Sequence, residues 1–205
     1  MEPPIGPDLA NLLARWRAGD GSALGELLES HRHYLTLLVR LQVGSRLRVK
    51  VEVEDLVQEA FLEAHHAASR FEGETLATFL AWLRRIVVTV LANQVRHYHG
   101  TQRRDLRLER SLADDLDRSS RRIEGGLIAP GGTPSEEASK VERALWLAEA
   151  VEGLPEDYRT VILLRNFEDL SFPEVAQRMG RSLDSVKNLW VRALARLRRA
   201  AGTHP

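Results

Sequence analysis

The side chains able to bind a metal ion are spaced so that they do not converge in this 205-residue chain. Asp55 and Glu59 lie one helical turn apart and could share a cation, but no third ligand accompanies them. The seven histidines include three close pairs, which are His31/His33, His65/His66 and His97/His99. Residues one or two positions apart point in different directions on a helix, so these pairs do not suit zinc. The sequence therefore predicts no metal site, no cofactor, no catalytic residues and no enzymatic activity.

The composition narrows the class of protein further. Cysteine is absent, which excludes disulfides, thiolate metal sites and cysteine nucleophiles. A hydrophobic content of 43% is typical of a globular chain. No apolar run approaches the ~20 residues that cross a bilayer, and the opening residues MEPPIGPDLA lack the features of a secretory signal. We expect a cytoplasmic protein without a membrane partner.

The formal net charge of zero hides two basic segments that flank an acidic one. Residues 84–110 hold seven arginines and two acidic residues, a charge of +5. Residues 178–199 hold seven cations and one acidic residue, a charge of +6. Residues 136–157 hold seven acidic residues and two cations, a charge of −5. Two dense basic segments on predicted helices favour a polyanionic partner over charged helices that merely face water.

Helical periodicity dominates the elements that carry these segments, so we expect an all-α fold of two small helical bundles. Residues 1–99 read as the first bundle, with helices over 9–18, 22–41, 54–69 and 76–98. Residues 100–133 read as a polar linker with little periodicity, whose first part extends the basic helix. Residues 134–205 read as a second, four-helix unit, which begins at a T-x-x-E capping box at Thr133.

The last two predicted helices form a helix-turn-helix. Ser171 and Glu174 make a capping box, Gly180 supplies a left-handed residue that ends the short helix, and Ser182 caps the longer one. On a helical wheel the inward face of the last helix holds Leu183, Val186, Trp190, Ala193, Leu194 and Leu197. The outward face holds Asp184, Ser185, Lys187, Asn188, Val191, Arg192, Arg198 and Arg199. Short polar groups near the start and cations further along suit the major groove of DNA. A plain helical hairpin with a solvated face is the structural alternative.

The segment LPEDYRTVILLRNFEDLSFPEVAQRMGRSLDSVKNLWVRALARLR resembles the fourth conserved region of bacterial sigma factors, in particular the extracytoplasmic-function (ECF) group. These proteins direct RNA polymerase to promoters, and this region reads the −35 element. The resemblance implies that −35 DNA is bound by Arg181, Ser182, Asp184, Ser185, Lys187, Asn188 and Arg192. Leu189 stands where many members have arginine, so arginine readout at that position is not expected here.

Two segments of the first bundle resemble the second region of the same family. VEVEDLVQEAFLEAHH resembles the segment that grips the coiled coil of the largest polymerase subunit, and it implies polymerase contacts through Asp55, Gln58, Glu59 and Leu62. TFLAWLRRIVVTVLANQVRHYHG resembles the segment that binds the −10 element, and it implies contacts through Arg85, Thr89, Asn93 and Arg96. Thr89 replaces an asparagine that is common there. Trp82 is expected to be a core anchor, and the loop at residues 71–75 lies where family members pocket a flipped base.

The resemblance implies a sigma factor that binds core RNA polymerase and directs promoter recognition, promoter opening and transcription initiation. Its implied partners are the clamp coiled coil of the largest subunit, the flap of the second-largest subunit and promoter DNA. Members of the group often have an anti-sigma factor as well, although no segment here identifies one. The alternative function is a stand-alone helix-turn-helix transcriptional regulator, which would bind its DNA without polymerase.

Overall fold

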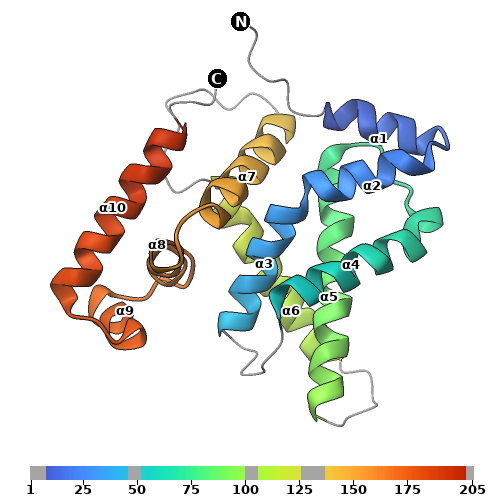
Figure 1. Cartoon of the computed structure of the whole chain (residues 1–205). Helices are drawn as coiled ribbons and strands as arrows, with labels where there is room; N and C mark the ends of the chain where they lie inside the picture. Colours follow the sequence, from blue (N-terminus) through green and yellow to red (C-terminus); the bar gives the residue numbers. More distant parts are fainter. Residues whose placement is uncertain (1–7, 46–51, 100–105, 126–136, 202–205) are drawn as a thin grey trace, which may run out of the picture.

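The structure is a computed structural model that describes residues 8–45, 52–99, 106–125 and 137–201. Within these ranges the regular elements are all helical, which confirms the all-α fold (Figure 1). The first half contains α1 (Leu9–Arg17), α2 (Gly21–Ser30), α3 (Arg32–Ser45), α4 (Val53–Ala67), the short turn η1 (Ala68–Arg70) and α5 (Leu76–His99). The second half contains α6 (Leu106–Gly125), α7 (Glu137–Glu152), α8 (Glu156–Ile162), the π-helical turn η2 (Leu163–Phe167), α9 (Phe172–Met179) and α10 (Leu183–Ala201).

The single helix predicted over residues 22–41 is wrong, because two helices, α2 and α3, occupy this stretch and meet at His31. Asp20 caps α2 in place of the expected Ser22, accepting bonds from the Ser22 amide at 3.0 Å and its hydroxyl at 2.6 Å. These bonds from Ser22, with a further one from Arg15, lower the pKa of Asp20 to about 2. At the break, the His31 ring nitrogen Nδ1 lies 2.7 Å from the Leu27 carbonyl oxygen. The bend directs α3 across the bundle.

Helix α5 is the central helix of the first bundle. It packs against α4 and α6 through buried residues that include Phe79, Leu83, Val87 and Leu91. By length and hydropathy alone, Leu76–His97 would suffice to cross a bilayer, with a mean hydropathy of 1.4. Its long apolar side chains instead contact neighbouring helices, as expected for the core helix of a helical bundle.

The interpretation of residues 106–125 as part of a linker with little periodicity is wrong. They form the 20-residue helix α6, which packs on α3, α5 and α7. Leu112, Leu116 and Ile123 recur at helical spacing and are at most 1% exposed. Polar residues hide this stripe in the sequence, because Asp115 and Ser120 are buried beside the three apolar residues.

A buried polar network fastens α6 to the first bundle. The Ser120 hydroxyl lies 2.9 Å from the Tyr34 hydroxyl on α3 and donates to Glu124 Oε1 at 2.6 Å. Arg84 on α5 donates to the Ser120 hydroxyl at 3.0 Å, and its guanidinium lies 3.4 Å from Asp117. Burial raises the pKa of Tyr34, so its hydroxyl stays protonated. These bonds satisfy the hydroxyl groups of Tyr34 and Ser120, which would otherwise be costly to bury.

Helix α7 joins the two halves of the molecule. It lies mainly against α3, α5 and α6, with smaller contacts to α8 and α10, so the predicted second unit shares its first helix with the first bundle. Arg40 on α3 reaches Glu152 at the end of α7 at 3.2 Å. The buried residues of both halves form one continuous cluster. The capping box predicted at Thr133 lies outside the described residues.

The predicted helix-turn-helix is confirmed. The Ser171 amide donates to Glu174 Oε2 at 2.7 Å, which forms the expected capping box at the start of α9. Hydrogen bonds from Ser171 lower the pKa of Glu174. Gly180 has φ 61° and ends α9 in the left-handed region, where a Cβ would be strained. Figure 1 shows α9 and α10 at one side of the molecule.

We expect His31 to make stability depend on pH. Its burial lowers the pKa from 6.5 to about 4, so the unfolded chain takes up the proton first as pH falls. Neutral, buried His31 makes its full contribution to the free energy of unfolding above about pH 6.5. This contribution is lost as pH falls toward 4. Between pH 7 and 4.5, wild type should lose roughly 2 kcal/mol more than a His31→Leu variant. Urea unfolding of both proteins at each pH measures this difference, and parallel pH profiles would contradict it.

Candidate functional site

One face of α4 is acidic and open to solvent. Leu56, Val57, Ala60 and Phe61 are buried against the bundle, as the sequence predicts. The opposite face exposes Asp55, Gln58 and Glu59 together with Leu62, whose surface is 54% exposed. Glu54 beside them is 3.5 Å from Arg40 of α3. The four predicted polymerase-binding residues thus lie on one surface that offers carboxylates, an amide and an apolar contact.

A polar stripe runs along the outside of α5. Arg85, Thr89 and Asn93 are exposed at four-residue spacing, and the Thr89 hydroxyl donates to the Arg85 carbonyl at 3.1 Å. Arg96 continues the stripe but is half-buried, because it pairs with Glu109 of α6 at 3.3 Å and donates to the Asn93 side-chain oxygen. The structure therefore presents three of the four predicted −10 residues openly and the fourth in an existing ion pair.

Part of the positive charge on α5 is directed inward. Arg84 was counted with the basic segment, yet its side chain enters the polar network under α6 and lies 3.6 Å from Glu124. Burial acts to lower the pKa of Arg84, but Tyr34, Glu124 and Asp117 outweigh it, so the pKa is raised and the charge is retained. Helical periodicity places Arg84 at the edge of the buried face, between Leu80 and Val87, and Arg85 on the opposite side. The partners that Arg84 meets beneath α6 depend on long-range packing.

Aromatic side chains support the loop at residues 71–75. Phe71 stacks on Trp16 with ring centroids 5.1 Å apart, and Trp82 lies 5.1 Å from Phe71. Trp82 is half-buried in this cluster, which agrees with its expected role as a core anchor. A Cβ on Gly73 would come within 2.4 Å of the Phe71 ring, so only glycine fits there without movement. The base-pocketing role of this loop stays a prediction.

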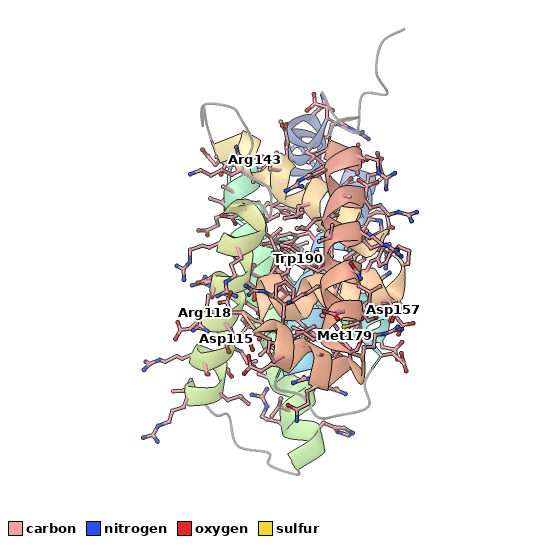
Figure 2. All side chains as sticks on the ribbon, turned by 90° about the vertical axis from the view of Figure 1, so that its left-hand side faces the viewer. Asp115, Arg118, Arg143, Asp157, Met179 and Trp190 are labelled. Carbon is pink, nitrogen blue, oxygen red and sulfur yellow. The ribbon has the colours of Figure 1, made fainter. Side chains whose placement is uncertain are left out.

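Helix α10 lies on the near side of the molecule in Figure 2, and the residues on its outer face are exposed. Val186, Ala193, Leu194 and Leu197 are buried, whereas Leu183, expected inside, is 39% exposed. Trp190 is half-buried, and its indole nitrogen donates to the Asn166 side-chain oxygen at 3.0 Å. Its ring also meets Phe172 edge-on at 5.4 Å. These contacts hold Trp190 of α10 on η2 and α9 and fix which side of α10 faces outward.

The predicted −35 residues divide into two groups. Asp184, Lys187, Asn188 and Arg192 are exposed on the outer face of α10. The other three, Arg181, Ser182 and Ser185, have partners within the protein. The Ser185 amide donates to the Ser182 hydroxyl at 3.3 Å, and Arg181 pairs with Asp157 at 2.7 Å. Asp157 and Arg181 are both exposed, so this surface ion pair contributes little to stability. A phosphate could therefore replace Asp157 as the partner of Arg181 at small cost.

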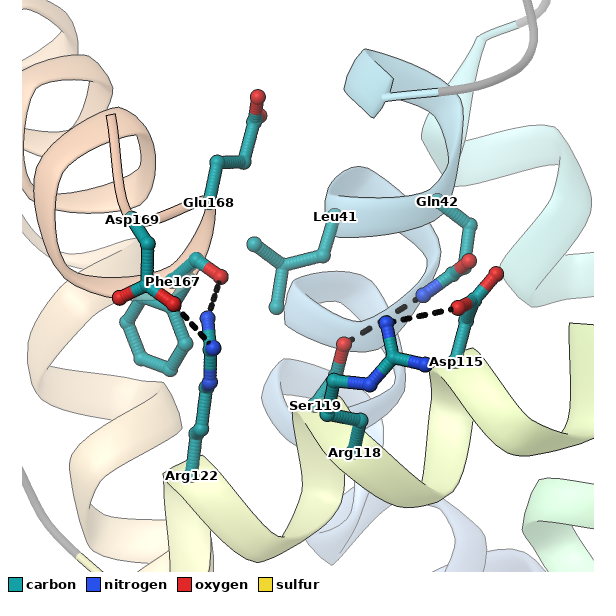
Figure 3. Close-up of a pocket in the computed structure, with 9 residues that line it drawn as sticks. All are labelled: Leu41, Gln42, Asp115, Arg118, Ser119, Arg122, Phe167, Glu168 and Asp169. Carbon is teal, nitrogen blue, oxygen red and sulfur yellow. Dashed lines mark hydrogen bonds and ion pairs between the residues drawn. The ribbon is translucent and has the colours of Figure 1, made fainter.

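A cavity of about 320 Å³, which the sequence does not predict, lies between α3, α6 and the turn after η2 (Figure 3). Arg122 of α6 donates to the Phe167 carbonyl and to the Asp169 carboxylate. Asp169 has φ 57°, an uncommon conformation for a residue other than glycine. On the α6 side, Arg118 pairs with Asp115 at 3.1 Å. Arg122 thus ties α6 to the turn that precedes the helix-turn-helix.

No group of three histidine, aspartate or glutamate side chains is placed to hold a metal ion within residues 8–45, 52–99, 106–125 and 137–201. The surfaces described above offer hydrogen-bond donors, acceptors and charges. Their chemistry suits recognition of other macromolecules.

Comparison with known proteins identifies the two halves. The family model described as sigma-70 region 2 matches residues 27–101, and that described as sigma-70 region 4 matches residues 144–197. The ECF RNA polymerase sigma-E factor of Escherichia coli K12 is 30% identical over 184 residues, covering 89% of this chain and 88% of that protein. The protein of the same name from Haemophilus influenzae is 29% identical, with 89% of each chain covered.

Solved structures with similarity to the chain include CnrH in complex with the cytosolic domain of CnrY, at 24% identity and a TM-score of 0.33. That match covers 96% of this chain and 98% of the other. The RsbN–BldN complex is 22% identical with a TM-score of 0.31, covering 91% of this chain and 97% of the other.

Both family regions occur in order, and the Escherichia coli relative aligns along most of the chain. The chain therefore belongs to the ECF group of the sigma-70 family, the sigma factors that bind core RNA polymerase and direct promoter recognition and transcription initiation.

Proposed function

We propose that three separate surfaces divide the work of this sigma factor. The exposed face of α4 docks on the clamp coiled coil of core polymerase, the stripe on α5 engages the −10 element, and the outer face of α10 reads the −35 element. The observation that carries this assignment is the exposure of all three faces on helices whose other sides are buried. A solvated face with no partner is the alternative for each one.

Charge supports the assignment of partners. The α4 face offers Asp55 and Glu59 to a basic helix of polymerase, and the two DNA faces offer exposed cations. Phosphate contacts contribute most of the affinity for DNA and make it salt-sensitive, whereas each good base contact contributes roughly 1–3 kcal/mol of discrimination. Lys187 and Arg192 can reach phosphates or base edges, and Asn188 suits adenine. Family membership favours this assignment over a stand-alone regulator, which would leave the α4 face without a role.

We also propose that the protein acts by binding, with no catalytic step of its own, and that it works in the cytoplasm with RNA polymerase. Polymerase supplies the chemistry of RNA synthesis. The sigma factor supplies interaction free energy that is available only at the correct DNA sequence. Tethering two weak DNA-binding surfaces to one polymerase raises the effective concentration of the second surface once the first has bound.

In the structure the helix-turn-helix is held against the first bundle through α7, and we call this the closed arrangement. Simultaneous binding of both promoter elements requires this arrangement to open. A compact chain of 205 residues has a radius of gyration of about 17 Å, hence a diameter of about 43 Å. Elements centred at −10 and −35 lie about 25 base pairs apart, or about 85 Å along straight duplex at 3.4 Å per pair. The closed molecule is too short by about a factor of two. The contacts to break are those of α7 with α3, α5 and α6, together with the bonds of Arg40 and Arg122.

Charge reversal on α4 tests the polymerase contact. The double variant Asp55→Lys, Glu59→Lys should lose association with core polymerase, because two attractive contacts become repulsive, and it should keep the helical circular-dichroism spectrum of wild type. Glu63→Lys on the same exposed helix is the matched control and should still associate. Co-purification with core polymerase measures the effect. Association retained by the double variant would mean that polymerase binds elsewhere.

Substitutions on α10 test the −35 assignment. Asn188→Ala should relax discrimination at one −35 position, at a cost of about 1–3 kcal/mol for the preferred base. Lys187→Ala and Arg192→Ala should weaken binding, and any phosphate contact they lose should lower the salt slope by about 0.9. Lys140→Ala, an exposed cation on α7, is the control. Binding of holoenzyme to a promoter library at several salt concentrations measures both effects, and unchanged base preference in all three variants would contradict the assignment.

A further inference from the structure

Val191 is an exposed aliphatic side chain in the middle of the polar face of α10. Its surface is 57% exposed, although valine favours burial. Single exposed apolar residues are normal on protein surfaces, so exposure alone assigns no role. The position of Val191 among the neighbouring polar residues makes it informative.

Helical geometry places Val191 between the residues assigned to base reading. At about 100° per residue, Val191 lies about 40° from Lys187 on one side and about 60° from Asn188 on the other. It also lies about 4.5–6 Å further along the axis than these two, a step of one to two base pairs at about 3.4 Å each. Lys187, Asn188 and Arg192 are exposed around it. A duplex that meets these side chains therefore also meets Val191.

The chemistry of the major groove limits what Val191 can contact. Base edges there present hydrogen-bond donors and acceptors, and the apolar group among them is the C5-methyl group of thymine. Valine has neither donor nor acceptor, so a contact with any other base edge would displace water without replacing its hydrogen bonds. Against a thymine methyl, the two valine methyl groups instead bury apolar surface on both partners.

We propose that Val191 is a specificity-determining residue that recognises the C5-methyl group of a thymine in the −35 element. This inference rests on the proposed function, in which the outer face of α10 reads −35 DNA. It adds a hydrophobic contact to the hydrogen bonds of Asn188 and the charges of Lys187 and Arg192. The preferred −35 sequence should accordingly contain a thymine one to two base pairs from those read by Lys187 and Asn188.

Removing a single methyl group from the DNA tests the proposal. A promoter selected by the holoenzyme itself is prepared with deoxyuridine in place of each −35 thymine in turn, which deletes the methyl group and keeps every hydrogen-bonding group. Wild-type holoenzyme should bind one of these promoters about fourfold more weakly, the ratio that corresponds to one buried methyl group. Val191→Ala holoenzyme should bind the thymine and deoxyuridine promoters equally. The control is Leu106→Ala, which removes an equally exposed side chain, 57%, from α6.

The outcomes separate this proposal from the function on which it rests. A deoxyuridine penalty of equal size in wild type and Val191→Ala would mean that another residue contacts the methyl group, and the absence of any penalty would mean that no methyl group is read. Either result overturns the role of Val191 while the −35 assignment stands, provided that Asn188→Ala still changes base preference. If Val191→Ala instead loses core polymerase and keeps its base preference, Val191 contacts protein, and the proposal is also overturned.

Discussion

The packing of α6 against α3, α5 and α7 is the interaction on which the whole closed molecule depends. Leu112, Leu116 and Ile123 place the apolar side of α6 into the core, and Ser120 completes the bonds of Tyr34 and Arg84 beneath it. Without α6, α7 would lose one of its main supports, and the helix-turn-helix would be held to the first bundle through the packing of α7 on α3 and α5. A segment placed in the predicted linker thus organises both halves.

This packing also decides which charges remain available for partners. Acidic residues of α6 pair with Arg84 and Arg96 of α5. Only part of the positive charge on α5 therefore remains available to a partner. Arg85 stays outside, as do Lys187 and Arg192 on α10. A protein of zero net charge can therefore present separate positive and negative faces, since its opposite charges are sorted between surfaces rather than mixed on each one.

The sequence predicts the helix-turn-helix well because its signals are local. The capping box at Ser171 and the left-handed Gly180 act within a few residues, and the alternation of buried and exposed positions on α10 follows its 3.6-residue period. The exposed positions on α4 and α5 follow from the same period, so the candidate residues on these helices could be placed on exposed faces, except Arg96, which pairs with Glu109. Their roles in binding come from family resemblance.

The parts that sequence reasoning missed depend on contacts between distant residues. The break at His31 follows from a buried ring that packs on Phe79, 48 positions along the chain. Helix α6 was hidden because its buried side includes Asp115 and Ser120, which are polar residues that only a preformed partner surface can satisfy. The contact of Arg122 with the turn at Asp169 has no sequence signal at all.

Under the function proposed above, the closed arrangement opens when the sigma factor binds both promoter elements. Because the chain has no cysteine, Ser69→Cys on η1 and Gln177→Cys on α9, both exposed, accept a donor and an acceptor dye without further changes. Energy transfer between them should be efficient in the free protein and should fall on formation of an initiating complex with core polymerase and promoter DNA. Transfer that stays equally efficient in a complex that makes transcript would contradict the account.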